Sequence, residues 1–252
     1  MRHFLPVIKP EIIICHDANE LSRKAAEQFV AVANDAVSAR GRCSVALSGG
    51  STPKALYALL ATDEFRSRLS WPQLHLFWGD ERCVPPDHAE SNFRMVREAL
   101  LSKISMPSEN IHRMAGEKAP ADGAADYQAQ LQNFFHLADG EWPRFDLVLL
   151  GLGEDGHTAS LFPGSAALNE QQCWVATSYV ERLHAHRLTL TFPVINYAAQ
   201  ISFLVSGASK APIIEAILRA GNDSLPAARI EPADGQLTWF VKQDAAGALA
   251  KR

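Results

Sequence analysis

Short, continuous apolar runs recur along the sequence, and stretches compatible with helices separate them. Runs of this kind are typical of strands that are buried on both faces of a sheet. Their alternation with helices predicts an α/β fold, Rossmann-like, with a mostly parallel sheet and helices on both faces. The runs lie at residues 43–47, 74–78, 145–150, 188–192, 201–205 and 237–241.

The clearest helix is predicted for residues 17–40. Apolar residues recur there at helical spacing, Asp17 with Glu20 has the pattern of a capping box, and Gly41 marks a stop. Shorter helices are expected after the turns that follow the apolar runs, at residues 92–101, 211–219 and 244–249.

No repeat, low-complexity tract or long linker divides the 252 residues, so we expect a single domain over residues 1–252. Residues 102–142 are polar and alanine-rich, and we expect them to be peripheral. The formal charge of −4 offers no general basic field to nucleic acid or to an anionic membrane. An anionic ligand would therefore need a local site.

The cysteines are scattered and form no CxxC pair, which indicates reduced thiols in a cytoplasmic protein rather than a disulfide framework or a metal site. Prolines and charged residues interrupt the first fifteen residues, and no apolar run is long enough to span a bilayer. We therefore expect a cytoplasmic protein with no membrane partner. The four cysteines are Cys15, Cys43, Cys83 and Cys173.

The segment SGGSTP at residues 48–53 joins a predicted strand to a predicted helix. Its glycines let the backbone approach an anion closely, and the helix start offers unpaired N–H groups. We expect Thr52 to be the N-cap and Pro53 to lie in the first turn. An ordinary tight turn remains an alternative, but the segment has neither a Walker lysine nor a GxGxxG pattern, which favours a small sugar phosphate over a nucleotide. The candidate ligands are Gly49, Gly50, Ser51 and Thr52.

Two further polar segments follow predicted strands. SGASK at residues 206–210 places Lys210 at a helix start, a position that an anion makes favourable. WGDER at residues 78–82 places Asp80 and Arg82 at another strand end. On an open surface these side chains would form ordinary ion pairs. In a cleft, the arginine would hold a phosphate, and the carboxylates would bind sugar hydroxyls or orient an imidazole.

The most specific string is GLGEDGHTASLFP at residues 151–163, directly after a very apolar run. Three glycines in six residues force an unusual backbone path, and His157 follows it. This is the one histidine among nine in such a setting. An isolated histidine is usually structural, but the glycines, the strand end and Asp155 favour His157 as a general base that Asp155 orients.

Together these segments resemble the 6-phosphogluconolactonase family, which shares a broad fold group with glucosamine-6-phosphate deaminase. The match runs over nearly the whole chain in the family's order: SGGSTP at Ser48, WGDER at Trp78, SNFRM at Ser91, GLGEDGHTASLFPG at Gly151, RLTLTFPVIN at Arg187 and SGASK at Ser206. The resemblance implies hydrolysis of 6-phospho-D-glucono-1,5-lactone, the second step of the oxidative pentose phosphate pathway, without metal or cofactor. It implies that His157 is catalytic and that Gly49, Gly50, Ser51, Arg82, Arg187 and Lys210 surround the substrate.

One segment departs from the family. Relatives often carry a Pro-Lys-Pro-like stretch before the RxTLT segment, where this chain has residues 180–186. Either Arg182 takes the place of that lysine, or the contact of this loop with the sugar is lost in this chain. The partner is expected to be a small sugar phosphate, without nucleic acid, bound by a monomer or weak homo-oligomer.

Two other functions compete. An aminosugar-phosphate isomerase or deaminase would use Asp80 to abstract a proton, but His157 is followed by the lactonase continuation TASLFP, and Arg82 stands where deaminases prefer an aromatic residue. A non-catalytic sugar-phosphate sensor would have no use for Asp155 and His157, and the sequence shows no DNA-binding helix or basic arm.

Overall fold

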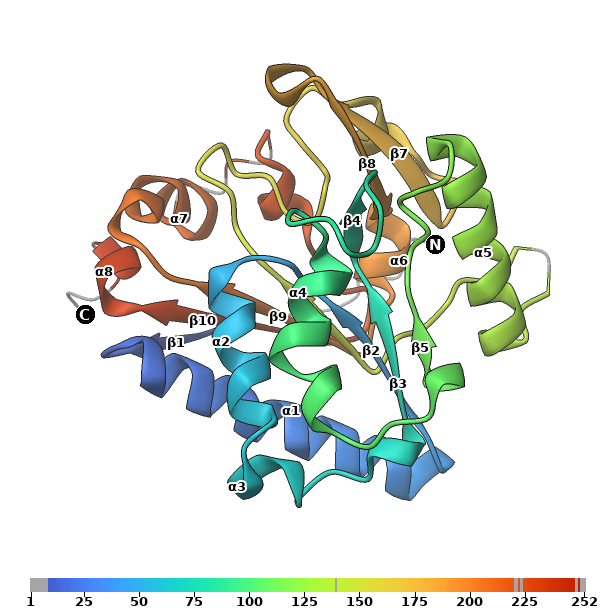
Figure 1. The fold of residues 1–252 in the computed structure, drawn as a ribbon. Coiled ribbons are helices and arrows are strands. Elements are labelled where there is room, and N and C mark those ends of the chain that lie inside the picture. Colours follow the sequence, from blue (N-terminus) through green and yellow to red (C-terminus); the bar gives the residue numbers. More distant parts are fainter. Residues whose placement is uncertain (1–8, 139, 220–221, 223, 248, 250–252) are drawn as a thin grey trace, which may run out of the picture.

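A computed structural model describes residues 9–138, 140–219, 222, 224–247 and 249. Within this part of the chain, seven strands form a central sheet in the order β1-β10-β9-β6-β2-β3-β5, and every neighbouring pair is parallel (Figure 1). The predicted α/β class is confirmed. The strands are β1 (Glu11–Cys15), β2 (Cys43–Leu47), β3 (Leu74–Trp78), β5 (Ile111–His112), β6 (Leu147–Leu150), β9 (Gln200–Val205) and β10 (Gln236–Lys242).

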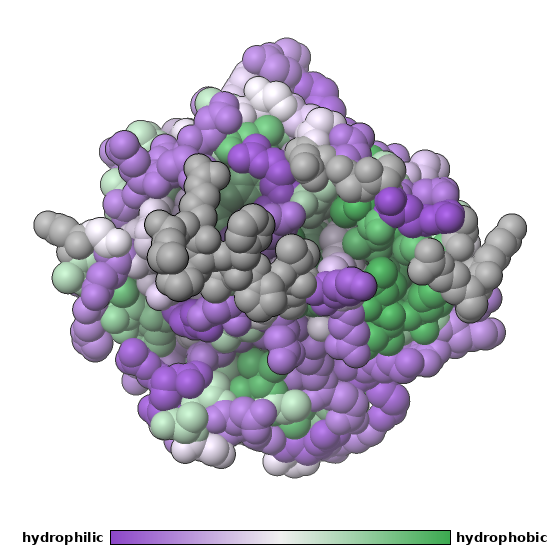
Figure 2. Space-filling model, turned by 180° about the vertical axis from the view of Figure 1, so that it is seen from behind, coloured by the Kyte–Doolittle hydropathy of each residue, from purple (hydrophilic) through white to green (hydrophobic). Residues whose placement is uncertain are grey.

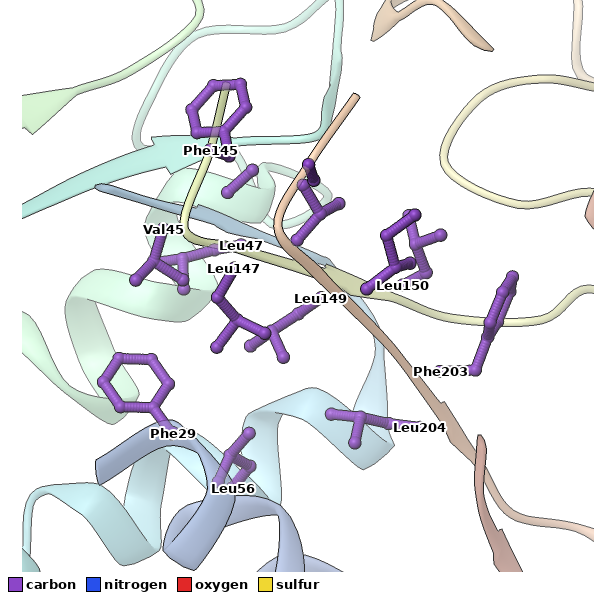
Figure 3. Packing of buried hydrophobic residues seen from close by; sticks show 14 of the residues in the cluster. Phe29, Val45, Leu47, Leu56, Phe145, Leu147, Leu149, Leu150, Phe203 and Leu204 are labelled. Carbon is purple, nitrogen blue, oxygen red and sulfur yellow. The ribbon is translucent and has the colours of Figure 1, made fainter. Parts of the chain in front are cut away.

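Helices cover the sheet on both sides, because the strands are apolar on both faces. Figure 3 shows Leu147 and Leu149 of β6 pointing toward Phe29 and Leu56, which come from the first two helices, whereas Phe203 of β9 points to the opposite side. The helices are α1 (Ala18–Arg40), α2 (Ser51–Leu60), α3 (Asp63–Arg66), α4 (Asn92–Ala99), α5 (Pro120–Phe135), α6 (Phe192–Asn196), α7 (Ala211–Leu218) and α8 (Gln243–Ala246).

The ends of α1 match the sequence prediction. Asp17 is the N-cap and accepts a hydrogen bond from the N–H of Glu20 at 2.9 Å, while the Glu20 carboxylate accepts from the N–H of His16. Gly41 ends the helix with φ +74°, in the left-handed region that glycine adopts without strain. The last predicted helix, over 244–249, is shorter in the structure, and its residue 248 lies outside the described part.

A second, three-stranded sheet was not predicted. The strands β4 (Asp80–Arg82), β8 (Ala185–Leu190) and β7 (Val175–Val180) pair antiparallel in the order β4-β8-β7, and they lie at the top of Figure 1. The expectation that 188–192 belongs to the parallel sheet was therefore wrong. Leu188 and Leu190 are buried, so this antiparallel strand has the pattern of an apolar run. It ends just before the helix that begins at Phe192, with Pro193 in its first turn.

The expectation that residues 102–142 are peripheral was also wrong. This segment supplies β5 at the edge of the central sheet and the long helix α5. Tyr127 and Leu131 of α5 are fully buried. Alanine and glutamine dilute the apolar face of this helix, and that dilution hid its periodicity in the sequence.

Viewed from behind, the surface is largely hydrophilic with hydrophobic areas between the polar side chains (Figure 2). No helix within the described residues is both long and apolar enough to cross a membrane. The large hydrophobic side chains that are exposed belong to separate elements: Ile12, Tyr179, Leu183 and Tyr197.

Candidate active site

The segments that follow β2, β3, β6 and β9 meet around one cavity of about 380 Å³. This is the edge of a parallel sheet at which α/β proteins bind ligands. Asp155 does not line the cavity but lies behind His157, to which it is hydrogen-bonded. The other nine predicted site residues all line it: Gly49, Gly50, Ser51, Thr52, Asp80, Arg82, His157, Arg187 and Lys210.

The turn after β2 presents the start of α2 to the cavity. Gly50 is the N-cap, with φ +102° and no side chain to cap the helix, so the first N–H groups of α2 are left for a ligand. The prediction that Thr52 is the N-cap was wrong, because the helix begins at Ser51, two residues earlier than that prediction requires. Thr52 Oγ1 instead lies 2.7 Å from Ser206 Oγ, and this hydrogen bond joins the two predicted phosphate turns.

Four cationic side chains line the cavity, and three of them, Arg82, Arg187 and Lys210, are predicted site residues. Arg82 and Arg187 stand directly opposite each other in the β4–β8 pair, and neither has a carboxylate within 4 Å among the described residues. Burial lowers the pKa of Arg187, and the charge of Arg82 lowers it further. Two adjacent guanidinium groups without an acidic partner favour an anion between them. Lys210 adds a third charge, and its nearest carboxylate oxygen, on Glu154, is 3.9 Å away.

His157 and Asp155 form a close pair. His157 Nδ1 lies 2.5 Å from Asp155 Oδ1, and the same oxygen accepts the backbone N–H of His157 at 3.1 Å. Partial burial opposes ionisation of Asp155, but the hydrogen bonds and charge of His157, with a smaller contribution from Arg182, hold the Asp155 pKa below its usual range. With Nδ1 donating to the carboxylate, Nε2 is the nitrogen that can accept a proton.

The imidazole is held on its faces as well as at Nδ1. The ring of Phe162 stacks on it, with centroids 4.2 Å apart and an angle of 29° between the planes. Gly153 lies against the ring, since a Cβ built on it would be 1.9 Å from His157 Nδ1. The string after β6 therefore fixes the orientation of the imidazole through several of its own residues.

Asp80 links two walls of the cavity. Its Oδ2 accepts a hydrogen bond from Ser160 Oγ at 2.7 Å, and its Oδ1 accepts from Asn92 Nδ2 at 3.3 Å. Neighbouring Glu81 is buried and accepts the N–H groups of Asn92 and Phe93, so it caps the start of α4. The carboxylates of WGDER thus hold the site together, and Glu81 does not orient the imidazole.

Sequence reasoning did not assign roles to four further residues of the site. Asn92 lies in the quoted SNFRM motif, and Ser160 and Phe162 lie in the string with His157, so their positions in motifs were the available signal. Asn92 and Ser160 contact Asp80 from other segments, which no local spacing reveals, whereas Phe162 stacks on His157 within the same string. Arg182, whose role the sequence leaves open, lines the cavity at the tip of the β7–β8 hairpin.

Comparison with known proteins agrees with this geometry. Residues 16–239 match the family described as glucosamine-6-phosphate isomerases/6-phosphogluconolactonase. The chain belongs to this family. The resemblance expected from the sequence motifs is therefore confirmed.

Two curated relatives and one solved structure that each cover most of the chain are named as 6-phosphogluconolactonases. A 6-phosphogluconolactonase of Nostoc sp. is 39% identical over 96% of this chain and all of its own length. One from Synechocystis sp. is 44% identical over 83% of this chain and 86% of its own. The solved 6-phosphogluconolactonase of Trypanosoma brucei superposes with a TM-score of 0.85 at 32% identity, covering 95% of this chain and 98% of its own.

Proposed function

We propose that this chain hydrolyses 6-phospho-D-glucono-1,5-lactone to 6-phosphogluconate, the second step of the oxidative pentose phosphate pathway. The shared cavity carries the proposal: His157, which is hydrogen-bonded to Asp155, and a cationic wall face one space of substrate size, and the two arginines of that wall have no carboxylate within 4 Å among the described residues. The names of the full-length relatives support the same reaction.

His157 is the general base of the proposed mechanism. Its Nε2 takes a proton from a water molecule as the water oxygen bonds to the lactone carbonyl carbon. The bond between that carbon and the ring oxygen then breaks, and the ring oxygen takes the proton from the imidazolium. Asp155 stabilises the imidazolium while it exists and keeps Nδ1 protonated. No step requires a metal or an organic cofactor.

The phosphate is anchored by the cationic wall and the start of α2. Arg82, Arg187 and Lys210 supply charge, while Ser51 and Thr52 supply N–H and hydroxyl groups. A dianion held there leaves the lactone ring to reach His157, so the phosphate orients the ester for attack.

The contacts of Asp80 favour hydrolysis over aminosugar deamination. Both of its carboxylate oxygens are engaged by Ser160 and Asn92, whereas a proton-abstracting base needs an oxygen directed at the substrate. We expect no ammonia release from glucosamine 6-phosphate.

A coupled assay tests the proposal. The lactone is generated in place, and acid release is followed above the spontaneous rate. His157→Ala is expected to lose at least about 100-fold in kcat, as for removal of a general base, while His16→Ala, at an 83% exposed side chain outside the cavity, keeps full activity. Wild-type protein that does not exceed the spontaneous rate would refute the assignment.

We further propose that the chain acts in the cytoplasm as a single domain, monomeric or weakly self-associating, without nucleic acid. The four cysteines are free thiols, as expected in a reducing compartment.

A further inference from the structure

The tip of the β7–β8 hairpin reaches the catalytic pair. A single turn of 3-10 helix, Glu181–Leu183, forms this tip and carries Arg182. Arg182 Nη2 lies 3.4 Å from Asp155 Oδ2, and its guanidinium carbon lies 5.8 Å from the ring centroid of Phe162. The same side chain is 63% exposed, so it stands between solvent and the cavity.

The two oxygens of Asp155 have different partners. Oδ1 accepts both hydrogen bonds from His157, and Oδ2 is the oxygen near Arg182. The terminal torsion of an aspartate is broad when a single oxygen is held. A second partner on Oδ2 narrows that torsion and keeps Oδ1 in line with Nδ1.

We infer that Arg182 is a positioning residue for the catalytic base, acting through Asp155 Oδ2 and through the Phe162 ring that stacks on His157. The inference rests on the proposed function for its kinetic readout. It gives the hairpin tip a role in the catalytic site.

Arg182 also acts by charge. Its guanidinium favours the Asp155 carboxylate and opposes a second positive charge on the imidazole. Removing it takes away one of the charges that hold the Asp155 pKa low, so the acid limb of the rate profile moves to higher pH. The other charged groups near the cavity stay in place in such a variant: Asp80, Arg82, Arg187, Lys210 and Glu154.

The test compares Arg182→Gln and Arg182→Lys with Glu181→Gln, which changes one charge at the same tip. Because an exposed ion pair contributes little free energy, we expect Arg182→Gln to lower kcat only about threefold and to leave KM nearly unchanged. The acid limb of kcat/KM should move to higher pH by a few tenths of a unit. Arg182→Lys should recover part of both effects, and Glu181→Gln should show neither.

A second measurement does not depend on turnover. Imidazole ¹⁵N spectra of the unliganded protein report the hydrogen bond between His157 Nδ1 and Asp155 directly, and the Nδ1 chemical shift should change in Arg182→Gln but not in Glu181→Gln. A higher KM with unchanged kcat and unchanged spectra would make Arg182 a substrate contact and overturn the inference. If wild type showed no lactonase activity, the proposed function would fall while the spectra still decided the role of Arg182.

Discussion

At the scale of single residues, Gly49 has no room for a side chain. A Cβ built on it would lie 2.0 Å from Asn92 Oδ1, and the Asn92 amide is held by Asp80. Gly49→Ala must displace Asn92 and shift the phosphate turn, so we expect KM to rise roughly tenfold, about 1.4 kcal/mol of binding. Steady-state kinetics measures the change.

Gly41→Ala provides the matched control for Gly49→Ala. Gly41 ends α1 at φ +74° with no atom within 4 Å of a built Cβ, and it lies outside the cavity. This variant should lose about 1 kcal/mol of unfolding free energy with KM unchanged. An equal rise of KM in both variants would mean that general destabilisation, not the phosphate turn, explains the effect.

Gly153 likewise has no room for a side chain, because it lies against His157 and Asp155. A Cβ there would lie 1.9 Å from His157 Nδ1 and 2.7 Å from Asp155 Oδ1. Gly153→Ala should separate the pair and lower kcat by about 100-fold, while binding of 6-phosphogluconate, measured by calorimetry, stays within about threefold. A comparable loss of product binding would show that phosphate and base do not occupy separate parts of the cavity.

At the scale of elements, a histidine pair joins β3 to β5 beneath α5. His75 Nδ1 lies 3.2 Å from His112 Nε2, and the His112 ring stacks on Phe77 at 4.2 Å. Burial lowers the pKa of His112 to about 4, and burial followed by the charge of Arg42 lowers that of His75. The folded protein therefore binds fewer protons here than the unfolded chain does between about pH 6.5 and 4.

Stability should consequently fall as pH drops through this window. We expect the pair to account for a loss of roughly 1–2 kcal/mol of unfolding free energy between pH 7 and 4.5, allowing for solvent screening. His112→Phe keeps the stacking and removes one titrating group, so urea unfolding should show a shallower pH dependence. His16→Ala, at an exposed histidine, should retain the wild-type slope.

Some of the observed strands and helices could be predicted from the sequence, and others could not. Parallel strands such as β2 and β3 were predicted at their observed bounds because short, continuous apolar runs between helices are typical of strands covered on both faces. The antiparallel β8 has the same appearance, since its side chains are largely buried, so only tertiary pairing distinguishes it. Helix α5 buries Ala124 and Tyr127 among many polar residues, and Pro120 at its start was the one clear signal.

The site was predictable to the extent that its chemistry lies within continuous motifs. His157, Asp155 and the phosphate turn each follow a strand, and the carboxyl ends of parallel strands must share one edge of the sheet. The contacts of Asn92 with Asp80 and of Arg182 with Asp155 join segments 12 and 27 residues apart through folding. Nothing in local spacing encodes them.

At the scale of the whole molecule, the two sheets share one core and one cavity. Leu190 of β8 donates its N–H to Gly79, whose own N–H is bonded to Leu47 of the central sheet. The strands β1 and β10, near the two ends of the chain, also pair with each other. Separating either sheet would open the cavity and expose the common core, so we expect the chain to unfold as one cooperative unit.

Tryptophan fluorescence can test this because Trp174 precedes β7 of the small sheet and Trp239 lies in β10 of the central sheet. In each single Trp→Phe variant at these positions, the urea midpoint from fluorescence should coincide with the far-UV circular dichroism midpoint of the same variant. Since the proposed anion ligands come from both sheets, 6-phosphogluconate at 100 times its Kd should raise the unfolding free energy seen by every probe by about 2.7 kcal/mol. Separate midpoints, or stabilisation seen by one probe alone, would mean that the small sheet unfolds independently and that residues 1–252 are not one domain.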